Sequence, residues 1–468
     1  GGTDGSVYFV SYWYPQMAVY DDLGGWQTDP YLGNAEFYMG WGDYEVLLTV
    51  PAGWLIGATG ELLNANAVLT PRIRGRLDGL RDDPVARGGG TVHVVEEGDR
   101  GAGRATQRGS SGRLTWHYRA HNVRDFAWGA SSEYLWDAAL APVGDGDGDG
   151  RPDSAVVHTL YRPDRVSWAW DQSARYARHS LQFLSKELWS YPYPQVTAVD
   201  GPTSCGGMEY PMITCIGGPR DTLSLYSVTV HELGHMWFPM QVGSNETRHS
   251  WQDEGLTRFN QAQAMRDFFP GYDLEAIVRD SYLSLARTGG ETALMRHGDR
   301  YPVDSPAFGV ASYQKMSTIL SMLRGLLGDE MFWRAYREYG RRWIGGHPTP
   351  LDFWRTFEDM SGEDLGWFWR TWFYETWTLD HAIDTVTARG SETVIVVSDL
   401  GRAPMPARLV IRRADGTIES REVPVTTWLA GATRFEFTVP TLPAISSVEL
   451  DPGHLFPDID RRNDRWPR

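Results

Sequence analysis

The sequence predicts an α+β protein of several domains: an N-terminal β-sandwich or saddle over residues 1–163, a mostly helical middle over 164–382 and a small C-terminal β-sandwich over 383–468. The chain of 468 residues is longer than one hydrophobic core usually serves, and its 41% hydrophobic residues can fill more than one core. Short β-branched and aromatic runs fill both ends of the chain, whereas the pattern between them has a helical period.

Four runs predict the strands of the N-terminal domain. They are rich in β-branched and aromatic residues and are separated by Gly, Pro and Asp; they cover residues 36–50, 91–98, 112–123 and 155–163. The chain begins GGTDGSVYFV, with neither an initiator Met nor a signal sequence. We therefore expect a processed or truncated product whose N-terminal domain is incomplete at its start.

An acidic segment, GDGDGDGRPD, precedes the last of these strands. It places Asp145, Asp147, Asp149 and Asp153 at positions 1, 3, 5 and 9 of a calcium-loop pattern, with Gly150 at the sharp turn. The bidentate Glu of position 12 is replaced by Val156. The segment predicts either a calcium site or a plain acidic hairpin loop.

The middle of the chain begins with a helical pattern over 171–189 and ends in the aromatic run 366–377, which we interpret as a buried helix face. Between them, residues 224–238 predict a helix that Pro239 closes. His231 and His235 are four positions apart on it, so both imidazoles face one side and can bind one metal ion. Glu232, one position round, is placed to act as a general base towards a metal-bound water.

A second helix is predicted to start at Ser250–Asp253, an [ST]-x-x-[DE] capping signature, with Glu254 in its first turn. Folded back antiparallel, it would supply a carboxylate as third ligand. Two His and one Glu leave the fourth position of a tetrahedral zinc open for water, which is the catalytic arrangement. Asp253 and Thr257 either support these ligands or are ordinary helix-surface polar residues.

Three runs predict the C-terminal β-sandwich: 392–400, 407–425 and 433–440. The second run contains Asp415-Gly416, a dipeptide typical of two-residue hairpin turns.

Charge and cysteine content exclude several classes of partner and bond. A net charge of −16 argues against a nucleic-acid partner, and the chain has no run of eighteen apolar residues that could span a membrane. Cys205 and Cys215 lie on CGGMEYPMITC. If that segment is extended, their Cα atoms are roughly 30 Å apart, too far for a disulfide. We expect two free thiols.

The metal motif and its surroundings resemble the gluzincin aminopeptidases, the family of aminopeptidase N and the leukotriene epoxide hydrolase. HELGHMWF is followed by the Glu of WQDEG; GGMEY (206–210) is similar to the family's G-x-M-E-N exopeptidase motif; and SYQKMSTILSMLRGLLG (312–328) is similar to its Y-x-K-G helix. Tyr210 replaces the motif's Asn, and Met316 replaces its Gly. The family's N-terminal domain starts earlier than this sequence does, and we expect this chain to lack the large C-terminal helical domain of some members.

The resemblance implies a thermolysin-like catalytic domain with zinc on His231, His235 and Glu254. It also implies that Glu232 is the general base and that Tyr313 donates a hydrogen bond to the oxyanion. Gly206, Gly207, Met208 and Glu209 would bind substrate, with Glu209 pairing with the α-ammonium of a peptide. In the family, the N-terminal domain usually supplies a second residue that binds the α-ammonium of the substrate, and Gln16 is our candidate for it.

We therefore expect a zinc aminopeptidase acting on peptides with a free N-terminus. Two alternatives stay open: a zinc metalloendopeptidase, and a non-catalytic, calcium-dependent surface binding protein. A missing N-terminal fragment of the same precursor is a further expected partner. We expect a secreted, periplasmic or cell-surface protein, with a cytoplasmic one left open.

Overall fold

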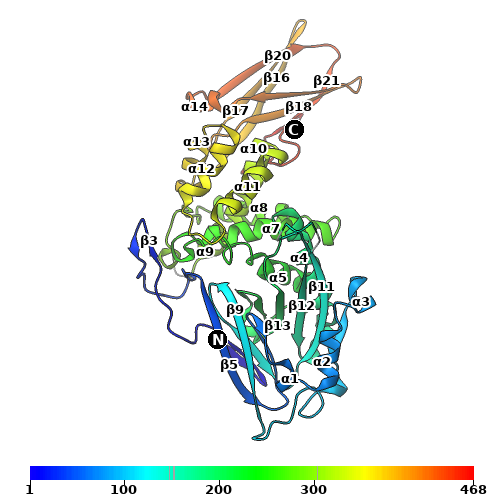
Figure 1. The fold of residues 1–468 in the computed structure, drawn as a ribbon. Coiled ribbons are helices and arrows are strands. Elements are labelled where there is room, and N and C mark those ends of the chain that lie inside the picture. Colours follow the sequence, from blue (N-terminus) through cyan, green and yellow to red (C-terminus); the bar gives the residue numbers. More distant parts are fainter. Residues whose placement is uncertain (147, 151–152, 303, 468) are drawn as a thin grey trace.

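The structure, a computed structural model, describes residues 1–146, 148–150, 153–302 and 304–467. In Figure 1 the sheets of the first half of the chain lie at the bottom, helices form the middle, and the C-terminal sheets lie at the top. The predicted multidomain α+β class is confirmed.

The N-terminal region contains a four-stranded sheet of order β1-β2-β10-β6 and a three-stranded sheet of order β5-β9-β7. Their strands are β1 (Gly2–Asp4), β2 (Val7–Val10), β5 (Gly42–Pro51), β6 (Leu55–Ala58), β7 (Glu61–Leu62), β9 (Arg113–Val123) and β10 (Trp128–Ser131). A two-stranded ribbon, β3 (Tyr20–Asp21) and β4 (Gly25–Trp26), lies beside them in the sequence. Side chains of β9 alternate between inside and outside, with Trp116 fully buried. The predicted strand 36–50 is wrong for residues 36–41, because this segment crosses to the helical region and its backbone is hydrogen-bonded there.

A six-stranded sheet with the order β14-β15-β13-β12-β11-β8 lies beneath the helices. Its strands are β8 (Val92–Val95), β11 (Leu135–Gly144), β12 (Asp153–Tyr161), β13 (Gln195–Asp200), β14 (Gly207–Tyr210) and β15 (Ile213–Ile216). β12, β13 and β15 run parallel, while β14 is an antiparallel edge strand. One sheet therefore spans the predicted boundary between residues 163 and 164. Helix α4 (Ser173–Glu187) packs on β11, and α5 (Thr222–Gly234) packs on α4.

The helical region continues with α7 (Glu254–Phe268), α8 (Leu274–Arg287), α10 (Met316–Leu327), α11 (Asp329–Trp343), α12 (Pro350–Ser361) and α13 (Gly366–Trp369). Its core is rich in aromatic residues. The predicted buried face of the run 366–377 is confirmed, since Phe368, Trp369, Trp372 and Phe373 are all buried. These helices stand between the six-stranded sheet and the C-terminal sheets in Figure 1.

The C-terminal region is a sandwich of two sheets, with orders β16-β17-β20 and β19-β18-β21-β22. The strands are β16 (His381–Arg389), β17 (Glu392–Asp399), β18 (Ala407–Arg413), β19 (Ile418–Val423), β20 (Arg434–Pro440), β21 (Ile445–Leu450) and β22 (Arg465–Trp466). The predicted two-residue turn at Asp415-Gly416 is wrong in length, because β18 ends at Arg413 and β19 begins only at Ile418. Gly416 has φ +90°, a conformation that glycine adopts without strain. The sandwich encloses its own apolar core around Ile395, Ile411 and Val448.

Cys205 and Cys215 form a disulfide, so the prediction of free thiols is wrong. The segment is a hairpin and not an extended strand: it turns back at Pro211-Met212, and Cys215 pairs with Met208 across β14 and β15. This brings the two Cα atoms to 6.4 Å, within the range that a disulfide spans. Gly201 leaves room for the bond, since a Cβ there would lie 2.1 Å from Sγ of Cys215.

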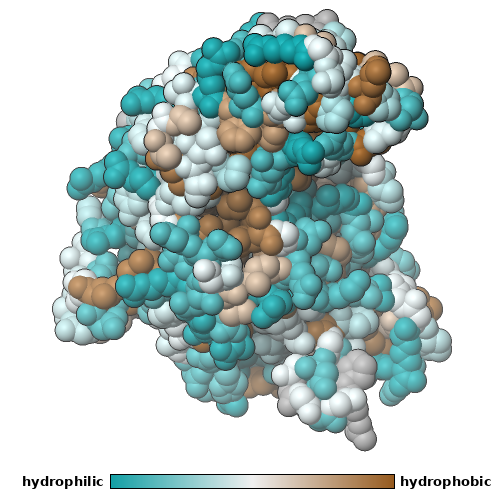
Figure 2. Space-filling model, turned by 90° about the horizontal axis from the view of Figure 1, so that it is seen from above, coloured by the Kyte–Doolittle hydropathy of each residue, from teal (hydrophilic) through white to brown (hydrophobic). Residues whose placement is uncertain are grey.

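The face of the molecule in Figure 2 is mostly hydrophilic, and its hydrophobic residues form several separate groups. In the part of the chain that the structure describes, no helix is both long and apolar enough to cross a membrane.

Candidate metal centre

The histidines of the H-E-x-x-H motif lie at the end of α5. Asp221 caps the start of this helix by accepting from the N–H of Ser224. The helix ends at Gly234, and His235 keeps a helical backbone as its C-cap residue, so His231 and His235 still face the same side. The predicted local geometry is therefore present.

The third member, Glu254, is the first residue of α7. The predicted capping box before it is wrong: the Ser250 hydroxyl lies 2.6 Å from the Ser312 hydroxyl, and no side-chain cap bonds the start of α7. A short 3-10 turn over Ser250–Gln252 leads into the helix instead. The Ser250 hydroxyl is thus hydrogen-bonded to Ser312 and does not form the bond to the helix backbone that a capping box requires.

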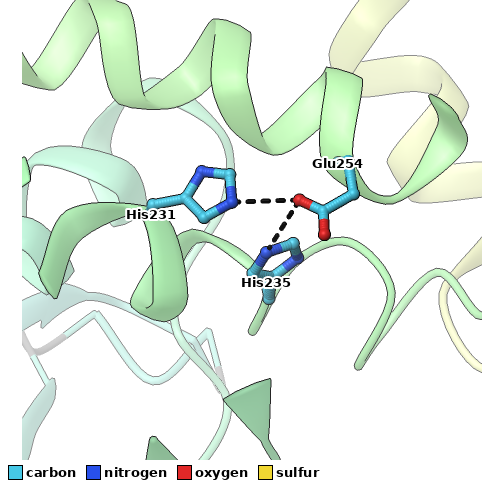
Figure 3. Close-up of side chains that lie close together, drawn as sticks. All are labelled: His231, His235 and Glu254. Carbon is cyan, nitrogen blue, oxygen red and sulfur yellow. Dashed lines mark hydrogen bonds and ion pairs between the residues drawn. The ribbon is translucent and has the colours of Figure 1, made fainter. Parts of the chain in front are cut away.

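These side chains converge on one point (Figure 3). Oε2 of Glu254 lies 3.0 Å from Nε2 of His231 and 3.6 Å from Nε2 of His235. One donor atom from each of the three lies within 4.8 Å of the other two, and all three residues are buried. Two imidazole nitrogens and one carboxylate oxygen are the donor set of a catalytic zinc, so the residues present fit this metal.

The hydrogen-bond partners of His235 engage its Nδ1 atom, so its Nε2 atom is the one that faces the metal position. Nδ1 lies 2.6 Å from Oδ1 of Asp253 and 3.0 Å from the carbonyl oxygen of Phe238. The hydroxyl of Thr257 donates to the same carbonyl at 3.1 Å. Asp253 and Thr257 are fully buried, so the interpretation as surface polarity is wrong for both. A partner at Nδ1 fixes the ring and its tautomer, as in metal-bound histidines.

The centre carries an excess of buried carboxylates. Burial raises the pKa of Glu209 to about 7, and burial together with repulsion from Glu254 and Glu209 raises the pKa of Glu36 to about 8. Burial also holds the pKa of Glu232 well above its usual range. Burial lowers the pKa of His235, but the surrounding carboxylates outweigh it and raise the value to about 9. The electrostatics therefore favour bound cations at this position.

Glu232 lies against the exopeptidase-like strand β14. A Cβ atom on Gly207 would lie 2.0 Å from Oε1 of Glu232 and 3.1 Å from Val228. No side chain fits there, so Gly207 is needed for the strand to pass directly beside this carboxylate. Gly206, at φ +61°, provides the turn into the strand.

Tyr313 also reaches the centre. Its hydroxyl donates to Oε1 of Glu254, and its ring stacks on His231 with the centroids 5.7 Å apart. It lies in a π-helical turn, Val310–Lys315, directly before α10. Such turns are frequent at functional sites because they redirect a side chain without ending the helix. The buried ion pair of Lys315 with Glu291, at 2.6 Å, holds this turn to the core.

Glu209 is buried on β14 and has a neighbour that sequence reasoning missed. Oxygens of Glu36, Glu209, Glu246 and Asp253 all lie within 4.8 Å of one another. Glu246 pairs with Arg124 at 2.7 Å. Nothing in the sequence marks Glu36, which is a single acidic residue inside a run predicted as strand. Gln16, the candidate partner, donates instead to Tyr14 and Asp125.

Residues 27–41, which we call the strap, carry Glu36 from the N-terminal region into the centre. The carboxylate of Asp299 accepts from the backbone N–H groups of Leu32, Asn34 and Ala35 at 2.9–3.2 Å. Glu246 accepts from the N–H of Phe37 at 3.1 Å. These bonds tie the strap to the helical region on both sides of Glu36, so its carboxylate has a fixed place.

The acidic segment over residues 144–153 lies apart from this centre. Asp145 accepts from the N–H groups of Gly148 and Gly150, and Asp153 accepts from the N–H of Gly146. Asp149 is exposed, and Asp147 lies outside the described residues. The calcium site stays a prediction.

Comparisons with known proteins agree with the metal motif. Residues 188–372 match the Peptidase family M1 domain. Aminopeptidase M1-D of Oryza sativa subsp. japonica is 28% identical over 203 residues, and Aminopeptidase 2 of Candida albicans is 23% identical over 218 residues. These alignments cover 39% and 42% of this chain and 23% of each relative. The chain thus spans about a quarter of the length of these curated relatives.

Solved structures share the fold. Aminopeptidase A of Legionella pneumophila superposes with a TM-score of 0.63 at 15% identity, covering 98% of this chain and 48% of that one. An M1 zinc metallopeptidase of Deinococcus radiodurans superposes with a TM-score of 0.52 at 16% identity, and the alignment covers 72% of this chain and 66% of that one.

Proposed function

We propose that this chain, which belongs to the gluzincin aminopeptidase family, is a zinc-dependent aminopeptidase that removes the N-terminal residue of peptides. The observation that carries the proposal is the proximity of two carboxylates, Glu209 and Glu36, to the convergence of His231, His235 and Glu254. A cleft with a metal site and a separate anionic site matches a substrate with a scissile carbonyl next to a free ammonium.

In this proposal His231, His235 and Glu254 hold the zinc. When bound, zinc polarises the scissile carbonyl and activates the attacking water. Glu232, buried beside β14, would take a proton from the water that attacks the carbonyl and pass it to the leaving amine. The Tyr313 hydroxyl donates to the carbonyl oxygen as negative charge develops on it.

The anionic site explains exopeptidase activity physically. Glu209 is buried and Glu36 is half-buried. Two carboxylates at such close range repel each other and lose hydration, and an ammonium between them relieves both costs. An internal peptide bond brings no positive charge, so an endopeptidase substrate would leave Glu209 and Glu36 uncompensated. The geometry thus supports the aminopeptidase over the endopeptidase alternative.

The test compares fluorogenic aminoacyl substrates with free and with acetylated N-termini, with and without a chelator. We expect free-amine substrates to be cleaved, acetylated ones to be resistant, and the chelator to abolish activity until zinc is returned. Glu209→Gln should raise the activation free energy that corresponds to kcat/KM by about 2–4 kcal/mol, the cost of leaving a buried charge pair incomplete. The zinc content should stay unchanged. Equal cleavage of acetylated substrates by the wild type would favour the endopeptidase.

We also propose an oxidising compartment, secreted, periplasmic or cell-surface. The Cys205–Cys215 disulfide supports this, because structural disulfides persist where thiols are not kept reduced.

A further inference from the structure

We propose that Arg258 binds a carboxylate on the residue that follows the scissile bond, either the C-terminal carboxylate of a dipeptide or the side chain of an acidic second residue. This rests on the proposed aminopeptidase function. Arg258 lies on α7, four positions after Glu254, so the two side chains share one face of the helix. One helical turn therefore separates this arginine from a metal ligand.

The guanidinium of Arg258 has no anionic partner. In the part of the chain that the structure describes, its one hydrogen bond runs from Nη1 to Oε1 of Gln261, at 2.7 Å, and no carboxylate forms an ion pair with it. Its Nε atom is buried without a hydrogen-bond partner. An arginine carries five N–H donors, and burying its charge without an anion is costly. The guanidinium thus retains donors for a carboxylate from outside the chain.

The place of this guanidinium is fixed from two sides. The amide of Gln261 donates in turn to the carbonyl oxygen of Ser227 at 2.7 Å and to its hydroxyl at 2.9 Å, which joins Arg258 to α5. On the other side, Cζ of Arg258 lies 5.6 Å from the centre of the Tyr313 ring, within cation–π range. A side chain that is already held in this way loses little conformational entropy when it binds a ligand.

The contacts of the two histidines place Arg258 and the amine site on different sides of the metal position. A carboxylate oxygen of Glu209 lies within 4.8 Å of a ring nitrogen of His235. The Tyr313 ring, next to Arg258, stacks instead on His231. A substrate with its ammonium on the His235 side and its carbonyl at the metal position directs its leaving group towards the His231 side, where the guanidinium lies.

The spacing suits the residue after the scissile bond. Four positions along a helix advance by about 6 Å, which is the offset between Glu254 and Arg258 along α7. Successive Cα atoms of a peptide are about 3.8 Å apart, so the carboxylate of a dipeptide lies one residue beyond the scissile carbonyl. An acidic side chain on the same residue reaches two or three bonds further. Both carboxylates fall within the range of the guanidinium.

The charges around Arg258 explain why the expected ligand is an anion. Burial lowers the pKa of Arg258, and the nearby Glu254 and Glu232 act against this lowering without pairing with the guanidinium. In the proposed function Glu254 is a zinc ligand, so its charge is committed to the metal. A carboxylate can accept two parallel, charge-assisted hydrogen bonds from a guanidinium, whereas a neutral group forms weaker ones.

The first experiment compares substrates that differ only in this carboxylate. It measures kcat/KM of the wild type for Leu-Ala against Leu-Ala-amide, and for Leu-Glu-amide against Leu-Gln-amide. We expect the acid to exceed its neutral counterpart by about 10–100-fold in at least one pair, the worth of one charge-assisted hydrogen bond. A gain in the first pair identifies the C-terminal carboxylate as the ligand, and a gain in the second identifies the side chain.

The second experiment changes the arginine. Arg258→Gln removes the charge and should bring the acid-to-neutral ratio to about one. Arg258→Lys keeps a point charge but lacks the planar fork, so its ratio should lie between those of Arg258→Gln and the wild type. The matched control is Arg266→Gln, the same change at an exposed position two turns later on α7, where the arginine pairs with Glu275 at 3.3 Å. It should keep the wild-type ratio, and all three variants should keep the wild-type zinc content.

The failure of this assignment differs from the failure of the proposed function. If no free-amine substrate is cleaved, the proposed function fails. If such substrates are cleaved but the wild type prefers neither acid, or if Arg258→Gln lowers acids and neutral counterparts equally, Arg258 only packs against Tyr313 and the assignment is overturned while the aminopeptidase stands. If Arg258→Gln does not fold, Arg258→Lys decides, because an unchanged ratio in that variant would also overturn the assignment.

Discussion

The metal centre at α5 and α7 and the acidic loop over residues 144–153 both follow sequence patterns of metal sites, yet the fold treats their carboxylates differently. At the centre, Glu209, Asp253 and Glu254 are buried; Glu209 comes from β14, and Asp253 and Glu254 come from the start of α7. In the loop, Asp145 and Asp153 accept hydrogen bonds from glycine N–H groups of the same loop. Spacing alone does not separate these two cases.

The difference shows that burial of a carboxylate is what makes a bound cation energetically favourable. A carboxylate in water is hydrated and loses little if no metal binds, whereas a buried one pays a desolvation cost that only a positive partner offsets. Arg124 is the positive partner of Glu246, at 2.7 Å, and offsets the desolvation cost of that carboxylate. The remaining carboxylates of the centre are left for zinc and, in our proposal, for an ammonium.

The strongest test of this contrast removes a ligand. His235→Ala should lose zinc and reduce kcat/KM by more than the 10–100-fold that loss of a supporting residue costs, because two ligands hold the ion poorly. Elemental analysis should find about one zinc per chain in the wild type and none in the variant. His454→Ala, at an exposed position of the C-terminal region, is the control. A fully active protein without zinc, cobalt or manganese would refute the metal site.

The zinc-ligand residues were predictable because their placement is largely local. His231 and His235 are one helical turn apart, and Glu254 begins the next long helix, so helical periodicity nearly fixes the site. The role of Glu36 and the Cys205–Cys215 disulfide could not be predicted, because both depend on where the chain turns. The hairpin at Pro211-Met212 and the path of the strap are set by tertiary contacts that no short pattern contains.

The same limit applies to boundaries within the fold. Strand β9 was predicted almost to its ends because its inward and outward side chains alternate regularly. Residues 36–41 carry equally β-prone side chains, but Glu246 and Thr247 bind their backbone and keep them out of β5. Local preference fails where another element takes the backbone hydrogen bonds.

Tyr313 gives the next largest effect. Tyr313→Phe removes only the hydroxyl donor, so kcat should fall about 10²–10³-fold, as for one oxyanion donor, with KM little changed. Zinc content should stay at the wild-type level, which separates this variant from loss of a ligand. A kcat within threefold of wild type would leave Tyr313 as an aromatic neighbour of His231 and would require another donor.

Glu36 tests whether the strap belongs to the site. Glu36→Gln keeps the shape but removes the charge, so kcat/KM for free-amine substrates should fall about 10–100-fold, the worth of one charge-assisted hydrogen bond. Gln16→Ala is the control from the same region, because Gln16 contacts Tyr14 and Asp125 instead. If Gln16→Ala has the larger effect, the amine partner is Gln16 and the strap only supports the fold.

The acidic loop supplies the smallest effect and the most direct check on the comparison. Exposed calcium sites of modest affinity have dissociation constants of about 10⁻⁴–10⁻³ M, so 1 mM calcium would add about 0.4–1.4 kcal/mol of stability by RT ln(1 + [L]/Kd). If the loop binds calcium, Asp147→Asn and Asp145→Asn should each abolish this gain in denaturant-unfolding curves, while magnesium gives less of it. Glu392→Gln, an exposed carboxylate outside the loop, should keep the gain. No shift with calcium in the wild type would mean that the glycine N–H groups already satisfy Asp145 and Asp153, so that the loop is an acidic turn and burial alone marks the metal site of this chain.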